Sequence, residues 1–129
     1  MNIQVPLRGF GFYPSPHDDV LDRLRASRDV TIKDVDVSAI RTKMELLVAV
    51  ARALDFPAAY LGHINYDSFE EAVRDLSWLH FSNIVIILTG CSRRWSDNYP
   101  VMAEILEILV DAHRFWDEQG KGFFVAFVE

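Results

Sequence analysis

The chain has 129 residues, of which 50% are hydrophobic and 25% are charged, so it can bury one core and does not have the composition of a disordered protein. Its net charge of −6 argues against direct binding of nucleic acid, which rewards clustered Lys and Arg, and favours a basic protein as partner. Its single cysteine, Cys91, excludes an internal disulfide framework and fits a reducing compartment. We see neither a secretion signal nor an apolar stretch long enough to span a membrane, and therefore expect a single cytoplasmic domain over residues 1–129, monomeric when free.

The residues before Asp29 carry weak structural signals. An alternating apolar pattern interrupted by a proline predicts an edge strand at Ile3, Val5 and Leu7. Glycines and prolines over residues 8–16 indicate a loop. Residues 17–25 fit a short helix, whose apolar positions are Val20, Leu21 and Leu24. We treat residues 1–28 as an extension of uncertain structure.

The pattern becomes clearer from Val30 onwards. Residues 30–37 alternate enough to predict a strand. Thr42, with Glu45 three residues later, predicts a capping box at the start of a helix that ends before Pro57. The apolar stripe expected on this helix is Met44, Leu47, Val48, Ala51 and Leu54.

The second half of the chain predicts two buried strands around a long helix. The continuous apolar runs at residues 84–88 and 123–128 are typical of strands covered on both faces. The helix between them is expected to begin near Asp97 and to end at Gly120. Its expected buried face is Ile105, Ile108, Leu109, Ala112 and Trp116. Strands joined through helices run parallel, so the sequence predicts an α/β fold with a three-stranded parallel sheet and three to four helices.

Between these halves, the segment "YLGHINYDSFEEAVRDL" (residues 60–76) predicts a loop and a short acidic helix. On a helix of 3.6 residues per turn, the polar side consists of Asp67, Glu70, Glu71, Arg74 and Asp75. The opposite side consists of Phe69, Ala72, Val73 and Leu76, which we expect to pack on the sheet. A solvated amphipathic helix with acids in its first turn, capped by Asp67 or Ser68, explains this pattern without any partner. The aromatic and polar residues just before the helix instead favour a protein-binding patch formed by Tyr60, His63, Asn65 and Tyr66.

The same stretch resembles the barstar family of intracellular ribonuclease inhibitors. The resemblance begins at the Leu-Asp-Phe-Pro run of residues 54–57 and covers about the last hundred residues, including the order of helices and strands. The matching residues in the loop and helix are Tyr60, Gly62, Asn65, Asp67, Phe69, Glu71 and Leu76. The resemblance implies that Asp67 and Glu71 are the acids inserted into a ribonuclease active site, and that Tyr60, Gly62 and Asn65 belong to the loop that shapes the contact.

The chain also departs from the family pattern. Two extra residues separate Pro57 from Asn65, and Glu70 stands where the best-known inhibitor has an aromatic residue. Phe115 occupies about the position of a glutamate in the last long helix of that inhibitor. These differences concern the identity of the partner more than the mode of binding.

Three hypotheses follow from these features. The favoured one is a non-enzymatic inhibitor, without cofactor or metal, that blocks a basic ribonuclease through an acidic surface formed by Tyr60, Gly62, His63, Asn65, Asp67, Glu70 and Glu71. The second is an immunity or interaction module for another basic protein or toxin. The third is a small enzyme that uses Cys91, although the arginine expected six residues after a phosphatase cysteine is replaced by Asp97. The four histidines show no metal-binding spacing, and no glycine-rich phosphate loop is present.

Overall fold

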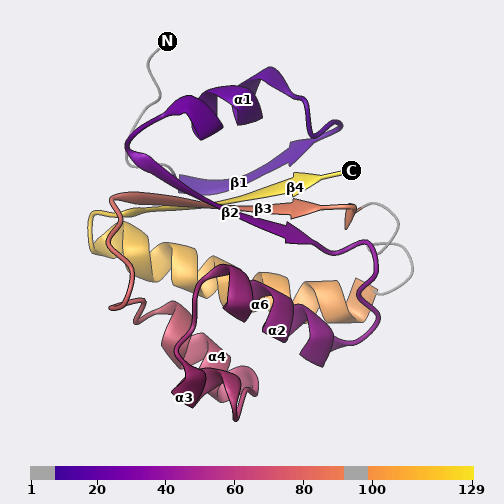
Figure 1. Cartoon of the computed structure of the whole chain (residues 1–129), viewed down its shortest axis with the longest axis vertical. Coiled ribbons are helices and arrows are strands. Elements are labelled where there is room, and N and C mark those ends of the chain that lie inside the picture. The colour runs from indigo at the N-terminus through magenta and orange to yellow at the C-terminus, as the bar shows by residue number, and fades with distance from the viewer. Residues whose placement is uncertain (1–7, 92–98) are drawn as a thin grey trace.

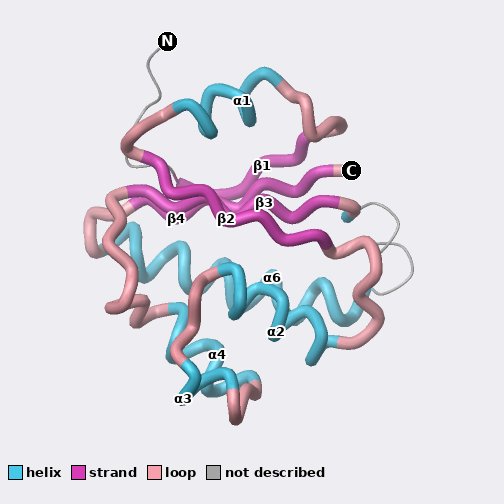
Figure 2. The backbone as a smooth tube through the Cα atoms, in the orientation of Figure 1, coloured by secondary structure: helices cyan, strands magenta, loops and turns pink. Residues whose placement is uncertain are grey.

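The computed structural model describes residues 8–91 and 99–129, and shows a four-layered α/β arrangement (Figure 1). A parallel sheet in the order β1-β4-β3-β2 separates α1 on one face from α2 and α6 on the other, and α3 and α4 lie beyond these two helices (Figure 2). The strands are β1 (Arg8–Tyr13), β2 (Val30–Asp36), β3 (Asn83–Thr89) and β4 (Gly122–Val128). The described helices are α1 (Asp19–Ala26), α2 (Lys43–Ala53), α3 (Ala58–Leu61), α4 (Tyr66–Val73) and α6 (Tyr99–Glu118).

The direction in which the chain crosses the sheet explains why α1 stands apart. From β2 through β3 to β4 the chain moves step by step toward β1, whereas from β1 to β2 it crosses the whole sheet in the opposite direction. Because such crossovers are right-handed, a reversal of direction moves the connecting helix to the other face. The core is accordingly divided in two by the sheet, with Leu21 and Leu24 of α1 packed on one face. The larger part of the core lies between the other face and α2, α4 and α6.

The sheet has four strands and the described residues form five helices, so the expectations of three strands and of three to four helices are wrong. The missed strand is β1, which lies in the residues interpreted as a loop and pairs in parallel with β4, from Arg8 opposite Phe123 to Tyr13 opposite Val128. The glycines that suggested a loop are compatible with this edge strand because the neighbouring aromatic side chains occupy their space. A Cβ at Gly11 would lie 2.8 Å from the Tyr13 hydroxyl and 2.9 Å from the Phe124 ring. The strand expected at residues 3–7 lies outside the described residues.

Several predicted elements are confirmed, but the buried sides of α1 and α2 differ from the predicted ones. The strands β2, β3 and β4 and the buried face of α6 agree with the sequence analysis, and Gly120 ends α6 with a φ of +76°. Helix α1 lies where a short helix was expected, although Val20 is 42% exposed. On α2 the expected stripe is rotated, because Met44 is 44% exposed and Val48 is only partly buried. The residues that do form the buried stripe of α2 are Leu46, Leu47, Val50, Ala51 and Leu54.

Packing of α1 on the sheet predicts that residues 8–28 fold together with the rest of the chain. Leu21 is fully buried, so Leu21→Ala should lower the free energy of unfolding by about 2–5 kcal/mol, in a single cooperative denaturant transition. Val20→Ala on the exposed side of the same helix should change it by less than about 0.5 kcal/mol. Equal, small effects of both substitutions, or a separate early transition, would show that α1 is not part of the cooperative domain.

Candidate functional site

The candidate surface is built on α3 and α4, which project from the layer formed by α2 and α6 (Figure 1). The main neighbours of α4 are α2, α3 and α6, which corrects the expectation that it packs directly on the sheet. The predicted apolar side is confirmed, since Phe69, Ala72, Val73 and Leu76 are at most 1% exposed. The Trp116 indole of α6 also donates a hydrogen bond of 2.9 Å to the Val73 carbonyl at the end of α4. With one side fixed in this way, the acids of α4 must face outward.

The start of α4 is set by Asn65, which corrects the expectation that Asp67 or Ser68 caps the helix. The Asn65 side-chain oxygen accepts a hydrogen bond of 2.9 Å from the Ser68 backbone N–H. In return, the Ser68 hydroxyl accepts a hydrogen bond of 2.9 Å from the Asn65 backbone N–H, which completes a capping box. Asn65, which was expected at the partner surface, therefore also has a structural role as the N-cap of α4.

The three acids of α4, and Asp75 two residues after its end, differ in their surroundings. The Glu70 carboxylate lies 3.6 Å from the Arg74 guanidinium, one helical turn away, so its charge is partly balanced within the chain. Asp67, Glu71 and Asp75 are exposed, and none of them has a cationic partner among the residues of the described ranges. These three carboxylates therefore remain available to pair with cations on another molecule.

Tyr60 bounds this acid row on one flank. Its half-buried ring lies 6.0 Å from the Phe56 centroid and 5.8 Å from the Trp78 centroid, so the aromatic core supports it. Burial, followed by the negative charges of Glu71 and Asp75, raises the pKa of the Tyr60 hydroxyl. Glu71 and Asp75 therefore lie within electrostatic range of this hydroxyl. Asp75, which the sequence analysis left out of the site, thus acts on the same hydroxyl as Glu71.

The other flank is formed by Tyr66, Lys43 and Glu104, which join the three helices α4, α2 and α6. The Tyr66 hydroxyl donates a hydrogen bond to the Glu104 carboxylate. The Lys43 ammonium lies 4.3 Å from the centre of the Tyr66 ring and 3.5 Å from the same carboxylate. The hydrogen bond from Tyr66 holds the pKa of Glu104 below its ordinary value, with Lys43 contributing in the same direction. No motif in the sequence revealed this triad, because its members are far apart in the chain.

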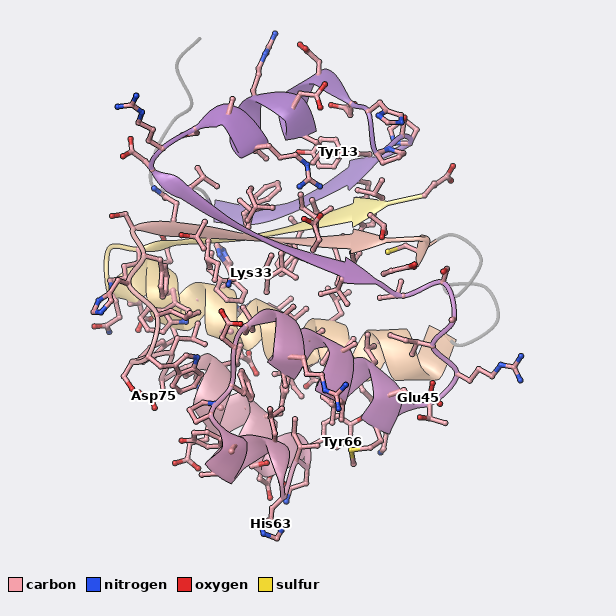
Figure 3. All side chains as sticks on the ribbon, in the orientation of Figure 1. Tyr13, Lys33, Glu45, His63, Tyr66 and Asp75 are labelled. Carbon is pink, nitrogen blue, oxygen red and sulfur yellow. The ribbon has the colours of Figure 1, made fainter. Side chains whose placement is uncertain are left out.

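Gly62 and His63 connect α3 to α4. Gly62 has an ordinary helical φ of −72°, and a Cβ there would meet only the Ala58 carbonyl at 3.5 Å, so the backbone does not require glycine. His63 is exposed at the outer tip of the turn, between the flanks marked by Asp75 and Tyr66 (Figure 3). The structure thus brings all seven predicted site residues onto α3, α4 and the turn that joins them.

Cys91 lies elsewhere, directly after β3, and does not resemble an activated thiol. It is buried, and its thiol donates a hydrogen bond of 3.1 Å to the Leu88 carbonyl. Burial raises its pKa to about 11, which keeps the sulfur protonated and poorly nucleophilic at neutral pH.

Within the described ranges, no three His, Cys, Asp or Glu side chains are grouped so that they could hold a metal ion. The same ranges contain no helix with the length and apolar character needed to cross a membrane.

The capping box predicts a division of roles between Asn65 and Asp67. Asn65→Ala removes the cap and should lower the free energy of unfolding by about 1 kcal/mol. Asp67→Ala, in the first turn of the same helix, should cost no more than a few tenths of a kcal/mol through the helix dipole. Denaturant unfolding of both variants checks this. A larger loss of unfolding free energy in Asp67→Ala than in Asn65→Ala would indicate that Asp67 caps the helix.

The Tyr66–Glu104 hydrogen bond predicts a pH dependence. Since the pKa of Glu104 is lowered in the folded chain, this bond stabilises the fold above the ordinary pKa of the carboxyl group and is lost as pH falls through the folded pKa. Tyr66→Phe should therefore lower stability at neutral pH, and the difference from the unmodified chain should shrink between about pH 5 and pH 3. Thermal unfolding over this pH range measures it, and a difference independent of pH would mean that Tyr66 contributes through packing alone.

Comparisons with known proteins concern the fold and the family of the chain. One solved chain, described as "Structure of Drosophila ORC bound to DNA", has a TM-score of 0.56 to this chain at 13% identity, which concerns the fold alone. The match covers 93% of this chain and 31% of that chain. No match was found among curated protein sequences. The family model described as "Barstar (barnase inhibitor)" matches residues 30–128, which includes the whole site and leaves out β1 and α1. The chain therefore belongs to the barstar family.

Proposed function

We propose that this chain is a stoichiometric protein inhibitor that binds a basic ribonuclease through the α3–α4 surface. Membership of a family described as barnase inhibitors supports this function. The single observation that carries it is the row of three outward carboxylates, Asp67, Glu71 and Asp75, which lack a cationic partner within the described part of the chain. A row of this kind, on a helix held by a buried apolar side, is suited to a partner with a cationic cleft.

The chemistry of ribonucleases explains why such a row would inhibit them. A ribonuclease binds a polyanion, so its cleft collects Lys, Arg and His side chains. Carboxylates inserted there can take the positions of phosphates and accept charge-assisted hydrogen bonds. The net charge of −6 adds a long-range attraction that speeds the encounter with a basic protein. We place this function in the cytoplasm, where an active ribonuclease would meet cellular RNA.

Within the surface, we assign the central contacts to Asp67, Glu71 and Asp75, with Tyr60 as the aromatic anchor beside them. This assignment differs from the sequence analysis at Asp75, which was not among the expected contacts. Glu70 is placed at the rim, because Arg74 partly balances its charge. Asp75 joins the contact, because it is exposed and has no cationic partner among the described residues. Gly62 and His63, at the exposed turn, would complete the rim of the contact.

The structure bears unequally on the other two hypotheses, an interaction module for another basic protein and an enzyme that uses Cys91. A module for another basic protein or toxin would use the same surface, and only the isolated partner distinguishes it from a ribonuclease inhibitor. An enzyme that uses Cys91 is not favoured, since the thiol is buried and its pKa is raised to about 11. Cys91→Ser should accordingly leave partner binding intact.

The proposed contacts predict a ranking of substitutions. With a small basic ribonuclease recovered by pull-down from the source cells, Asp67→Ala, Glu71→Ala and Asp75→Ala should each weaken binding by about 2 kcal/mol or more, because each leaves a cation of the partner unpaired. Glu70→Ala is the matched control on the same helix and should weaken binding by less than about 1 kcal/mol. Binding kinetics and inhibition of RNA cleavage measure both effects.

The same kinetics at several salt concentrations test the electrostatic part. The association rate should fall steeply as salt shortens the Debye length to about 8 Å and below, whereas dissociation should change much less. Equal losses at all four acids would indicate a diffuse field instead of inserted carboxylates. Recovery of a basic protein without ribonuclease activity would instead support the second hypothesis, in which the same surface binds another basic protein or toxin.

A further inference from the structure

A shallow hollow on the described surface, separate from the acidic row, gathers basic side chains from three loops. It has a volume of about 450 Å³ and lies where β2, β3 and β4 begin. Arg28 comes from the loop before β2, His80 from the loop before β3 and Lys121 from the loop before β4. The remaining lining residues are Asp29, Thr31, Leu79, Phe81 and Ser82.

Backbone contacts fix these three loops against one another. The side-chain amide of Asn83, which is 2% exposed, donates a hydrogen bond of 3.2 Å to the Asp29 carbonyl. The Gly122 N–H donates a hydrogen bond of 2.9 Å to the Ser82 carbonyl. The loops that carry the lining residues are therefore held in place at the start of the sheet.

Its two permanent cations are not balanced by ion pairs. The Lys121 ammonium lies over two aromatic rings, 4.8 Å from the Phe81 centroid and 5.7 Å from the Trp116 centroid, which holds it at the edge of the hollow. In the parts of the chain that the structure describes, neither Arg28 nor Lys121 has a carboxylate within ion-pair distance, unlike Arg25 and Lys33, which pair with acids. Asp29 is the one acid that lines the hollow.

Neutral donors complete the site. The hydroxyls of Thr31 and Ser82 line the same hollow, and neither has a side-chain hydrogen bond to another described residue. Two cations with adjacent hydroxyls are the donor set that binds phosphate in proteins, where the charges neutralise the anion and the hydroxyls donate to its oxygens.

We propose that this hollow binds a small phosphate-bearing molecule, with Arg28 and Lys121 neutralising the phosphate and Thr31 and Ser82 donating hydrogen bonds to it. Its volume falls within the range of about 300–1,000 Å³ that is usual for small-molecule sites. A long polyanion such as RNA is disfavoured, because the net charge of −6 repels it beyond the hollow itself. The lining residues are distinct from those of the acidic row, so this site does not depend on the proposed inhibition of a ribonuclease.

The first test is a titration with inorganic phosphate, measured through the backbone amide NMR shifts of the chain. Sodium chloride keeps the ionic strength constant throughout. Saturable shifts should concentrate at residues 28–31, 79–82 and 121–122. The double variant Arg28→Gln/Lys121→Gln should weaken phosphate binding about tenfold or more, since hydrogen bonds between ionised groups are the strong ones. Arg52→Gln, which removes a charge from an exposed position of α2 that does not line the hollow, is the matched control and should bind phosphate unchanged.

Asp29→Asn gives a test in the opposite direction. This substitution removes the one opposing carboxylate but keeps the backbone carbonyl that Asn83 contacts, so phosphate binding should become about threefold tighter. A gain in affinity cannot result from misfolding. Shifts that chloride reproduces, shifts that do not saturate, an equal loss in Arg52→Gln, or no gain in Asp29→Asn would each overturn the proposal.

Discussion

The packing of α4 on its neighbours is the constraint on which the proposed surface depends. Phe69 and Val73 are fully buried, and the Trp116 indole holds the Val73 carbonyl, so the helix has one rotational setting. The chain leaves α4 with Leu76 at a φ of +44°, a conformation that costs a non-glycine residue about 1–2 kcal/mol. Burial of the Leu76 side chain, which is 1% exposed, returns about 1.5–3 kcal/mol and offsets that cost. The outward direction of the acids is therefore a consequence of the core.

The two flanks hold the acidic row in different ways. On one side the aromatic cluster of Phe56, Tyr60 and Trp78 supports the surface through burial, and the Trp78 indole donates a hydrogen bond of 2.9 Å to the Leu54 carbonyl at the end of α2. On the other side, Lys43 and Glu104 bind Tyr66 through charge and hydrogen bonding. Apolar support is insensitive to pH and salt, whereas the polar triad responds to both. The surface is thus fixed at one flank and adjustable at the other.

The sequence predicted the interior strands and α6 correctly because their burial leaves a strong apolar pattern. It missed β1, because two glycines and flanking prolines suppress the strand signal and the pairing with β4 spans most of the chain. It rotated the stripe of α2 because that helix is apolar almost all round, from Leu46 to Ala51, so that periodicity cannot select one face. Helix α3, with four residues, is too short to leave a periodic pattern.

The candidate site was predicted less completely than the fold. The direction of the acids followed from helical spacing, but their partners within the chain did not. Helical spacing places Glu70 and Arg74 on the same side, but only the structure shows that these two side chains form an ion pair. The hydrogen bond between Tyr66 and Glu104 joins residues 38 positions apart, and only the tertiary structure brings them together.

The place of Trp78 has a practical consequence. Its ring contacts Tyr60, which borders the acidic row, while its other neighbours belong to the core. A molecule seated on Tyr60 would change the polarity and the quenching around this indole without any change in the fold. Intrinsic tryptophan fluorescence can therefore report occupancy of the surface directly, with an unlabelled protein in solution.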